Sequence, residues 1–587
     1  MSSFTPKDPG SPPPTLRSAL LRSALAFVIT FALFTLLWAI CINPYYFPYG
    51  DSFSIFVNSI PLFHPSASAW FLHGFQTYFD VYPDMSLHAT NFIRPVVNGT
   101  FFLGWFAYGA HWSRYLLTTY AIIGLIAATT CFLAGYILRL GWRLTLLATL
   151  CVAVAPSVDT GAIFDPTFAF DLFGGLLVLL GVTALIFDAL VPAWFFFALA
   201  VFTKETTLFA PALAAVILFL RKKESPLYAR IATSAAFLLP LVAWLTLRWN
   251  DFHGEKGLYV FIDRSSHGPI HVMLVRIILG LTTWPIAAVV YWSSIPLLLR
   301  LLQKASLLIN IVFWPVLAIL LLKKAVKSDL HLADLPAPLR AHGEKYAIAI
   351  LTLFCAASLL IPLVLNVPRR FGGVFYPLFI LCLVSTARYA NKALLRTTSA
   401  ALAAIVGITG AILICSDIHY QTPTLHSVWA LSRDYVSRLS ASNEPELFVV
   451  DDLSGRYSST EYVKLFSGYK GRLIRLNDLG WNFSCTAPLH VIVNSHPNGD
   501  ATITSLVPKQ CGDHSFNSVF PPVDPKLTTF TRALPAVTLQ YDLTHPLPTS
   551  DPSTASNKLQ IELHSPAPGS SVIFADPLTL HYEKLPL

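Results

Sequence analysis

The sequence predicts a polytopic α-helical membrane protein with about 11 transmembrane helices, followed by a C-terminal soluble domain that is α/β or β-rich. Of the 587 residues, 54% are hydrophobic and 12% are charged. That charged fraction is about half of the roughly 25% found in ordinary soluble domains. Apolar runs of about 18 or more residues recur before residue 418, which is long enough to cross a bilayer. After residue 418 the apolar content falls, while Pro, Ser, Asp and Asn become more frequent.

The formal net charge of +8 does not indicate a nucleic-acid partner. Lys and Arg gather in short segments between apolar runs, as they do in cytoplasmic loops under the positive-inside rule. We therefore expect the lipid bilayer, and no nucleic acid, as the partner of these charges. The eight cysteines form no CxxC motif and no Cys/His cluster with the spacing of a zinc site.

The chain divides into three predicted parts. Residues 1–19 are rich in Pro and Ser and predict a disordered cytoplasmic tail. Residues 20–417 predict the transmembrane domain, with a large first outer loop at 42–97, and residues 418–587 predict an extracytoplasmic domain. The apolar run 283–299 is interpreted as interfacial or re-entrant; if it spans, the C-terminal domain would be cytoplasmic. The predicted spans are 20–41, 112–137, 144–157, 163–187, 191–203, 207–221, 230–247, 305–322, 345–366, 374–387 and 398–416.

Charges beside the spans indicate their direction. Arg221, Lys222 and Lys223 follow the sixth predicted span and place its end inside. Counting spans then places Lys204 outside. The loop 42–97 contains a single Lys or Arg, Arg94, and is also predicted to lie outside. The N-terminus is therefore expected in the cytoplasm, and two independent stretches are assigned to one outer face.

The C-terminal domain is predicted from short β-type runs. Residues 447–450, 473–476 and 489–493 are typical of short strands, and 458–466 of a helix between the first two. This alternation predicts a small α/β unit. Further strands are predicted at 537–541, 559–564 and 578–582. Cys485 and Cys511 either form a disulfide, if the domain lies outside, or remain two thiols.

The loop 42–97 supplies the first candidate catalytic residues. Asp51 follows the first span beside Gly50 and several aromatic residues. A partly desolvated carboxylate at this position is basic enough to remove a proton from an acceptor hydroxyl. Alternatively, Asp51 is a solvated loop residue or the N-cap of a helix. Asp80 and Asp84 are weaker candidates of the same kind.

Several cations are candidates for binding a phosphate. Lys204 and Glu205 lie between two short apolar runs, where charges are costly unless they face a polar cavity or are paired. The alternative is that the two residues mark a simple loop. Arg94 precedes Pro95 and either binds phosphate through its fork of donors or anchors the chain at the interface.

Charges near the fourth and ninth predicted spans complete the candidate site. Arg369 and Arg370 form a double cation on the predicted outer side, which suggests an anionic ligand or lipid headgroups. Asp159 and Asp165 could face the same cavity as these cations. Asp171 lies deeper among Phe residues and is expected to pair with a cation.

The pattern resembles the GT-C superfamily of integral membrane glycosyltransferases. The resemblance covers about residues 20–220. It rests on one span, then an outer loop with an early Asp51 and a later Arg94-Pro95, and then Thr203-Lys204-Glu205 at an outer helix end. The branch of protein O-mannosyltransferases and the lipid A aminoarabinose transferase is the most similar. Two positions differ: many relatives have Glu after the first-loop Asp, where this chain has Ser52, and Gly after the Lys, where it has Glu205.

This resemblance implies an inverting sugar transfer from a polyprenyl-phosphate donor to a glycan, lipid or protein acceptor at the outer face of a bacterial inner membrane. Asp51 would be the general base. Lys204, Arg369, Arg370 and Arg94 would bind the donor phosphate, with no metal and no cofactor. Two other functions remain open: a catalytically silent relative that binds glycan or protein, and a flippase or transporter of lipid-linked glycans.

Overall fold

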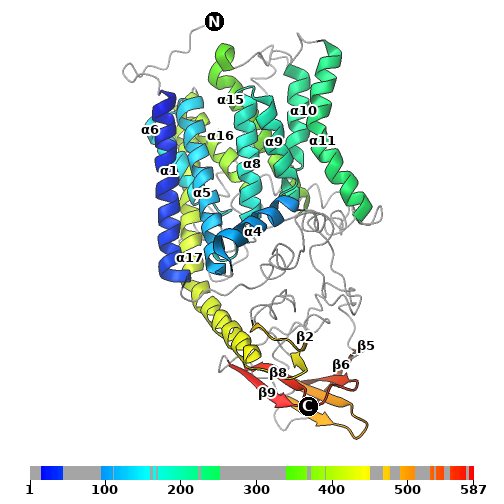
Figure 1. Ribbon diagram of the computed structural model, residues 1–587. Coiled ribbons are helices and arrows are strands. Elements are labelled where there is room, and N and C mark those ends of the chain that lie inside the picture. Colours follow the sequence, from blue (N-terminus) through cyan, green and yellow to red (C-terminus); the bar gives the residue numbers. More distant parts are fainter. Residues whose placement is uncertain are drawn as a thin grey trace. The chain divides into compact units, whose positions relative to one another are not determined.

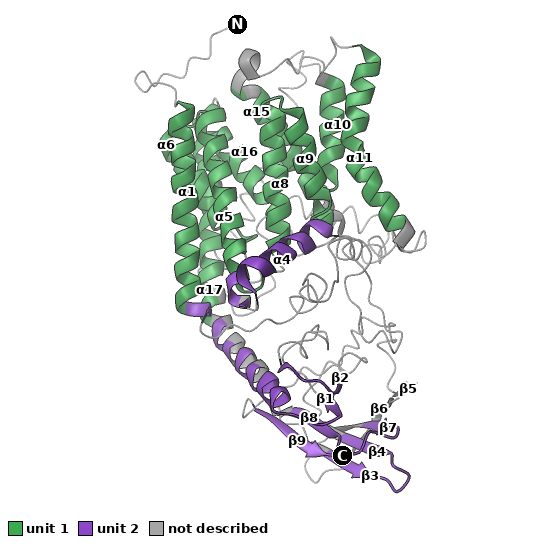
Figure 2. Cartoon of the chain, viewed as in Figure 1, with its two compact units in different colours: residues 1–40, 115–419 green, residues 41–114, 420–587 purple. Residues whose placement is uncertain are grey.

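The computed structural model describes residues 15–43, 94–109, 111–158, 163–166, 169–221, 226–251, 339–365, 372–390, 392–449, 467–475, 490–508, 529–533, 537–547, 556–576 and 581–587. The described chain is mostly helical, and strands occur in its C-terminal part (Figure 1). It forms two compact units, which are coloured separately in Figure 2. Unit 1 comprises residues 1–40 and 115–419, and unit 2 comprises residues 41–114 and 420–587.

Unit 1 is built from apolar helices that run side by side (Figure 1). Two of the helices extend into short π-helical segments: α1 into η1, and α5 into η5. The elements are α1 (Leu16–Leu37), η1 (Trp38–Ile42), α5 (Tyr115–Phe132), η5 (Leu133–Ile137), α6 (Trp142–Ala153), α8 (Ala169–Ile186), α9 (Leu190–Val201), the 3₁₀ turn η7 (Glu205–Thr207), α10 (Phe209–Arg221), α11 (Leu227–Asp251), α15 (Leu339–Leu365), α16 (Phe375–Tyr389) and the first part of α17 (Ala393–Ser440).

Five described helices are long and apolar enough to cross a membrane: Leu16–Ile42, Tyr115–Ile137, Ala169–Ile186, Leu227–Trp249 and Ala393–Cys415. Five shorter apolar helices accompany them. These helices are compatible with an integral membrane protein and confirm that part of the predicted fold class. The eleven predicted spans are not confirmed as a set, because five described helices are long enough to span and the predicted span 305–322 lies outside the described residues. The run 283–299, interpreted as interfacial or re-entrant, also lies outside them.

The helices of unit 1 run in two opposite directions: α1 and α5 are antiparallel, whereas α5 and α8 are parallel. Phe34 near the end of α1 stacks on Tyr120 near the start of α5, with ring centroids 5.5 Å apart. Phe132 near the end of α5 meets Phe187 just after α8. Helices α8 and α9 are joined by a short turn containing Asp188, which adopts a left-handed φ of 60°. These contacts define two distinct ends of unit 1, one at the start of α8 and the other at its end.

Helix α17 is longer than predicted. The expected span 398–416 was predicted to end where the C-terminal domain begins, but the helix continues to Ser440. The boundary between the two units, at residues 419 and 420, therefore falls within one helix. Pro423 lies inside this helix and does not end it. Composition misled the prediction here, because the last turns are polar on one side and buried on the other: Trp429 and Tyr435 are almost fully buried.

Unit 2 contains a mixed four-stranded sheet in the order β2–β1–β8–β9. Strand β1 (Glu446–Val449) pairs in parallel with both β2 (Arg472–Arg475) and β8 (Ser571–Asp576), while β9 (His581–Pro586) is antiparallel to β8. Strands β1 and β2 confirm the predicted runs 447–450 and 473–476. The predicted helix 458–466 lies outside the described residues.

A second sheet of unit 2 has five antiparallel strands in the order β3–β4–β7–β6–β5. Its strands are β3 (His490–Ser495), β4 (Ala501–Pro508), β5 (Thr529–Ala533), β6 (Val537–Leu547) and β7 (Ser556–Leu563). Predicted strands 489–493, 537–541 and 559–564 match β3, β6 and β7. Strands β4, β5 and β8 were not predicted, and the run 578–582 overlaps β9 only at its start. Unit 2 also holds helix α4 (Pro95–Tyr108) and the 3₁₀ turn η4 (Trp112–Arg114).

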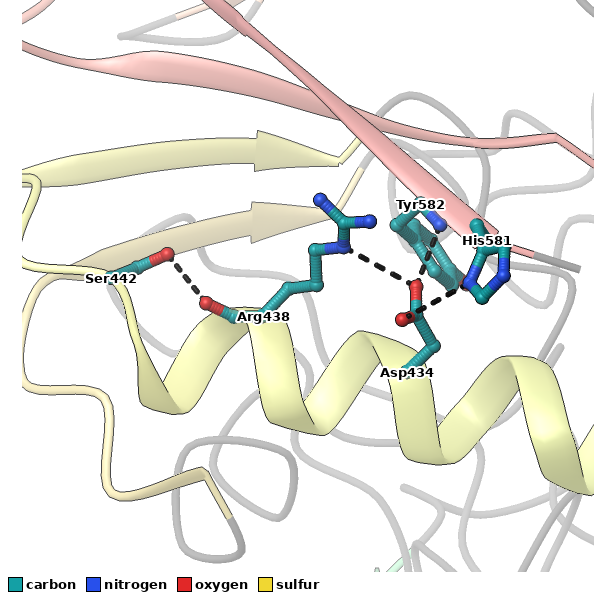
Figure 3. Close-up of polar contacts among 5 residues, drawn as sticks. All are labelled: Asp434, Arg438, Ser442, His581 and Tyr582. Carbon is teal, nitrogen blue, oxygen red and sulfur yellow. Dashed lines mark hydrogen bonds and ion pairs between the residues drawn. The ribbon is translucent and has the colours of Figure 1, made fainter.

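The last turns of α17 are attached to strand β9 of the four-stranded sheet. Asp434 accepts a hydrogen bond from the backbone N–H of Tyr582 at 2.7 Å and lies 3.4 Å from both Arg438 and the His581 ring (Figure 3). The Tyr435 and Tyr582 rings stack with centroids 4.8 Å apart. One carboxylate and one aromatic pair thus join the helix to the sheet.

Candidate functional site

The candidate site lies at the end of unit 1 where α8 begins. Lys204 follows α9 and precedes the 3₁₀ turn η7, and its own backbone is extended, with φ −156° and ψ 140°. The Thr203 hydroxyl donates to the Leu199 carbonyl oxygen, and the Thr207 hydroxyl donates to that of Lys204. These bonds satisfy carbonyl oxygens at the helix end and hold Lys204 between two helices.

The Lys204 ammonium forms a buried ion pair. Its Nζ lies 3.3 Å from Oδ2 of Asp171, and the two side chains are 11% and 3% exposed. The Thr206 hydroxyl donates to the other carboxylate oxygen, Oδ1, at 3.4 Å. This geometry confirms the expectation that Asp171 pairs with a cation.

The position of Asp171 in the first turn of α8 favours its charged form. Unpaired N–H groups at the start of a helix give it a partial positive charge, which stabilises a carboxylate there. Burying a carboxylate or an ammonium alone would cost several kcal/mol. The start of α8, the Lys204 ammonium and the Thr206 hydroxyl together offset the cost of burying the Asp171 carboxylate. Both ionised groups can therefore be retained among apolar helices.

A close backbone contact joins α8 to the segment that begins α16. A Cβ atom at Gly373 would lie 2.4 Å from the carbonyl oxygen of Asp171, and one at Gly175 would lie 2.2 Å from the carbonyl oxygen of Gly373. No side chain fits at either position without moving the backbone. Lys204 is also at this contact, because a Cβ at Gly174 would lie 3.6 Å from its Cβ. Three segments distant in sequence therefore meet at one helix end.

Two further predicted acidic residues are buried in unit 1. Glu205 follows Lys204 directly, begins η7 and is 4% exposed. Asp165 lies shortly before α8 and is 1% exposed. Asp171 and Glu205 thus bring acidic groups to the segment that holds Lys204, so an anion that binds there must be matched by additional cations.

The remaining predicted site residues are distributed as follows. Arg94 is 8% exposed and belongs to unit 2, where it is the N-cap residue of α4. Asp51, Asp80, Asp84, Asp159, Arg369 and Arg370 lie outside the described residues, and their roles stay predictions. The described chain resumes after the two arginines at Gly372, next to the Gly373 contact.

The sequence predicts that Asp171 pairs with a cation, but it does not identify Lys204 as that cation. The available signal was the position of Asp171 inside an apolar run, where an ionisable residue indicates a functional or paired group. Among the residues that the structure describes, no group of three or more His, Cys, Asp or Glu side chains is arranged to hold a metal ion.

Comparison with known proteins identifies no family for this chain. No model of a known protein family matches it, and no curated protein matches its sequence. The function must therefore be inferred from the chemistry of its residues: a lysine buried beside a helix-terminal carboxylate, at one end of a bundle of apolar helices.

Proposed function

We propose that the protein is a membrane glycosyltransferase that moves a sugar from a polyprenyl-phosphate donor to an acceptor hydroxyl. The transfer is inverting and takes place at the outer face of the membrane, at the end of unit 1 that holds Lys204. The acceptor is a glycan, a lipid or a protein. This proposal extends the resemblance of the sequence to the GT-C superfamily.

In the proposed reaction the acceptor oxygen attacks the anomeric carbon of the sugar. The new carbon–oxygen bond forms as the bond between that carbon and the phosphate oxygen breaks, with inversion at the anomeric centre. Asp51 takes the proton of the acceptor hydroxyl, and polyprenyl phosphate leaves with the bonding electrons. Lys204, Arg369, Arg370 and Arg94 stabilise the negative charge that the phosphate gains.

The buried Lys204–Asp171 pair is the observation that carries this proposal. A cation held among apolar helices is a functional hypothesis by default, because its burial is expensive. A fixed cation at the end of apolar helices is suited to a substrate that combines an anionic phosphate with a long hydrocarbon chain.

The contact of Gly373 with the start of α8 supports the involvement of the arginine pair. Arg370 precedes Gly373 by three residues in the sequence. The contact fixes the start of α16 beside Asp171, which is itself paired with Lys204. Three residues of chain span only a short distance. We therefore infer that the arginines contribute to the same phosphate site, where their positive charges would offset the negative charges of Asp171 and Glu205.

The proposal is tested by sugar transfer in membranes supplied with radiolabelled polyprenyl-phosphate sugars. The variants are Asp51→Asn, which removes the base but keeps the shape, and Lys204→Gln, which removes the cation. Arg22→Gln is the matched control, because Arg22 lies in α1 at the opposite end of unit 1 from Lys204. Protein level is measured for every variant.

We expect transfer by the wild type and by Arg22→Gln, and a loss of about 100-fold or more in Asp51→Asn, since general base catalysis contributes roughly 10²–10⁴-fold. Equal transfer by Asp51→Asn and the wild type would remove Asp51 from the mechanism, and Asp80 and Asp84 would be substituted next. No transfer by the wild type from any donor pool would overturn the proposal in favour of a silent relative or a flippase.

A further inference from the structure

The end of unit 1 opposite Lys204 carries an unusual concentration of arginine. Arg139 follows η5, Arg143 lies in the first turn of α6, Arg388 lies in the last turn of α16, and Arg396 lies in the first turn of α17. We call these four residues the basic end. They come from four separate elements, so their proximity depends on how the helices pack.

Contacts between the elements bring the basic end together. The Tyr389 hydroxyl, next to Arg388, donates a hydrogen bond to the carbonyl oxygen of Leu138, next to Arg139. The Thr145 hydroxyl, two residues after Arg143, donates to the Leu140 carbonyl oxygen at 3.2 Å. The end of α16, the turn after η5 and the start of α6 therefore form one junction.

The packing of α17 on α6 adds Arg396 to this junction. A Cβ at Gly407 would lie 2.6 Å from Sγ of Cys151, and one at Gly410 would lie 1.7 Å from the carbonyl oxygen of Val154. Both contacts advance by three residues in each helix, so α6 and α17 run parallel with their backbones in close contact. Arg396 precedes Gly407 by 11 residues and Arg143 precedes Cys151 by 8. At 1.5 Å per residue their levels along the helices differ by about one turn.

The surroundings of the basic end are those of a membrane interface. Trp142 is 65% exposed, and the Arg143 guanidinium lies 5.6 Å from the centroid of its ring. Leu394, two residues before Arg396, is 78% exposed. An exposed tryptophan beside an arginine is typical of the headgroup level of a bilayer. The amphipathic indole ring suits this boundary, and the guanidinium can bind the phosphates of the lipid headgroups.

Acidic residues at this end neutralise only part of its charge. Glu344 lies 3.5 Å from Arg139. Asp188 lies half-buried in the turn after α8. Arg396 donates one N–H of its guanidinium to the carbonyl oxygen of Ala390, whereas an arginine has five such donors. The arginines and Lys392, the exposed lysine before α17, outnumber these two carboxylates among the described residues.

We propose that Arg143 and Arg396, flanked by Arg139 and Arg388, form a binding site for the headgroup of an anionic phospholipid. The two guanidinium groups would share the headgroup phosphate, while Trp142 and Leu394 contact the acyl chains. Charge complementarity selects an anionic lipid, and exposed apolar side chains select a lipid over a small phosphate. The site is distinct from Lys204 and does not depend on the proposed sugar transfer.

The test measures lipid binding to the purified full-length chain by native mass spectrometry in detergent. The probes are phosphatidylglycerol, phosphatidylcholine, inorganic phosphate and glycerophosphoglycerol, which has the headgroup without acyl chains. The variant Arg143→Gln/Arg396→Gln is compared with Arg17→Gln/Arg22→Gln. The control removes the same charge from α1, whose start lies at the same end of unit 1 because α1 and α5 are antiparallel.

We expect the wild type to bind phosphatidylglycerol more tightly than phosphatidylcholine. Affinity for phosphatidylglycerol should fall roughly 30-fold in Arg143→Gln/Arg396→Gln, because two basic side chains no longer attract the anionic headgroup. It should change less than about threefold in the α1 variant, with phosphatidylcholine binding unchanged in both. If the first variant fails to fold, Arg143→Lys/Arg396→Lys replaces it and should still bind the lipid more weakly than the wild type, because lysine lacks the planar fork.

Three outcomes would overturn the proposal. An equal fall in affinity in both double variants would mean that total charge, and no local site, attracts the lipid. Equal binding of phosphatidylglycerol and phosphatidylcholine by the wild type would remove the requirement for an anionic headgroup. Displacement of the lipid by equimolar inorganic phosphate or glycerophosphoglycerol would show an anion site without a role for acyl chains.

Discussion

Lys204, which follows α9, and Asp171, in the first turn of α8, form a buried ion pair with Nζ 3.3 Å from Oδ2. A second ion pair of unit 1 provides a contrast, because Arg139 and Glu344 are 62% and 29% exposed at a similar distance of 3.5 Å. Solvent screens the second pair much more than the first. The two pairs therefore allow the effect of burial to be separated from that of distance.

Asp171→Ala should destabilise unit 1 more than Glu344→Ala does. Removal of one partner leaves the Lys204 ammonium buried without its carboxylate, which costs about 3–5 kcal/mol, whereas an exposed pair contributes about 0–1 kcal/mol. The measurement is thermal unfolding of the full chain in detergent. The double variant Asp171→Ala/Lys204→Met should recover most of the stability, because neither charge remains. Equal unfolding midpoints for Asp171→Ala and Glu344→Ala would contradict this energetic role.

Gly373→Ala should displace the start of α16 from α8. The added Cβ would lie 2.4 Å from the Asp171 carbonyl oxygen, and forced overpacking of this kind costs about 1–3 kcal/mol. Gly141→Ala is the control, because a Cβ at Gly141 meets no atom within 4 Å and its φ is −58°. The unfolding midpoint should fall in Gly373→Ala alone. If the proposed function holds, the KM for the lipid-linked donor should also rise, since the neighbouring arginines would move. A Gly373→Ala variant as stable as Gly141→Ala would mean that the contact relaxes at little cost.

The sequence was sufficient to place most helices of unit 1, because long apolar runs identify membrane helices with little ambiguity. Their ends were found within a few residues where cations or polar residues interrupt the runs, as at Arg221. The pairing of Lys204 with Asp171 could be anticipated only in part. The two residues are 33 positions apart, and they meet because α8 and α9 pack antiparallel with the start of one beside the end of the other.

Unit 2 was less predictable because its elements depend on distant partners. Strand β8 pairs in parallel with β1, more than 120 positions earlier in the chain, and such non-local pairing leaves little local signal. The polar end of α17 looked unlike a helix because its stability comes from packing: the Tyr435 ring stacks on that of Tyr582 in β9. For strand β8 and for the end of α17, tertiary contacts determine the secondary structure, although the local composition does not indicate it.

Asp434→Ala should loosen the attachment of α17 to β9. Asp434 accepts the Tyr582 N–H at 2.7 Å and lies 3.4 Å from Arg438 and His581 (Figure 3). The buried backbone N–H would lose its acceptor, which costs about 1–3 kcal/mol, while the exposed Arg438 and His581 side chains contribute little. Hydrogen exchange of the full chain should show faster exchange at β9. Glu583→Gln is the control, because Glu583 lies on the same strand and is exposed. Unchanged exchange in Asp434→Ala would show that the Tyr435–Tyr582 stack holds the strand alone.

Tyr469 should make the four-stranded sheet sensitive to high pH. Burial, together with the negative charge of Glu446, raises the pKa of Tyr469 from 10.0 to about 12. The folded state therefore keeps its proton where the unfolded state has lost it. Stability that Tyr469 contributes is fully present below pH 10 and is lost as pH rises toward 12. The neutral hydroxyl donates to the Glu444 carbonyl oxygen at 2.8 Å, a bond that ionisation would remove.

The measurement for Tyr469 is ultraviolet difference absorbance of the wild type minus Tyr469→Phe, taken through an alkaline titration of the full chain. The difference isolates one tyrosine among 22 and should titrate near pH 12 rather than near 10. Hydrogen exchange at β1 and β2 supplies the structural readout. It should accelerate above pH 10 by more in the wild type than in Tyr469→Phe after correction for intrinsic exchange, because the variant has no proton to lose. Titration near pH 10 would mean that the hydroxyl is solvated in the folded chain and that Glu444 does not hold it.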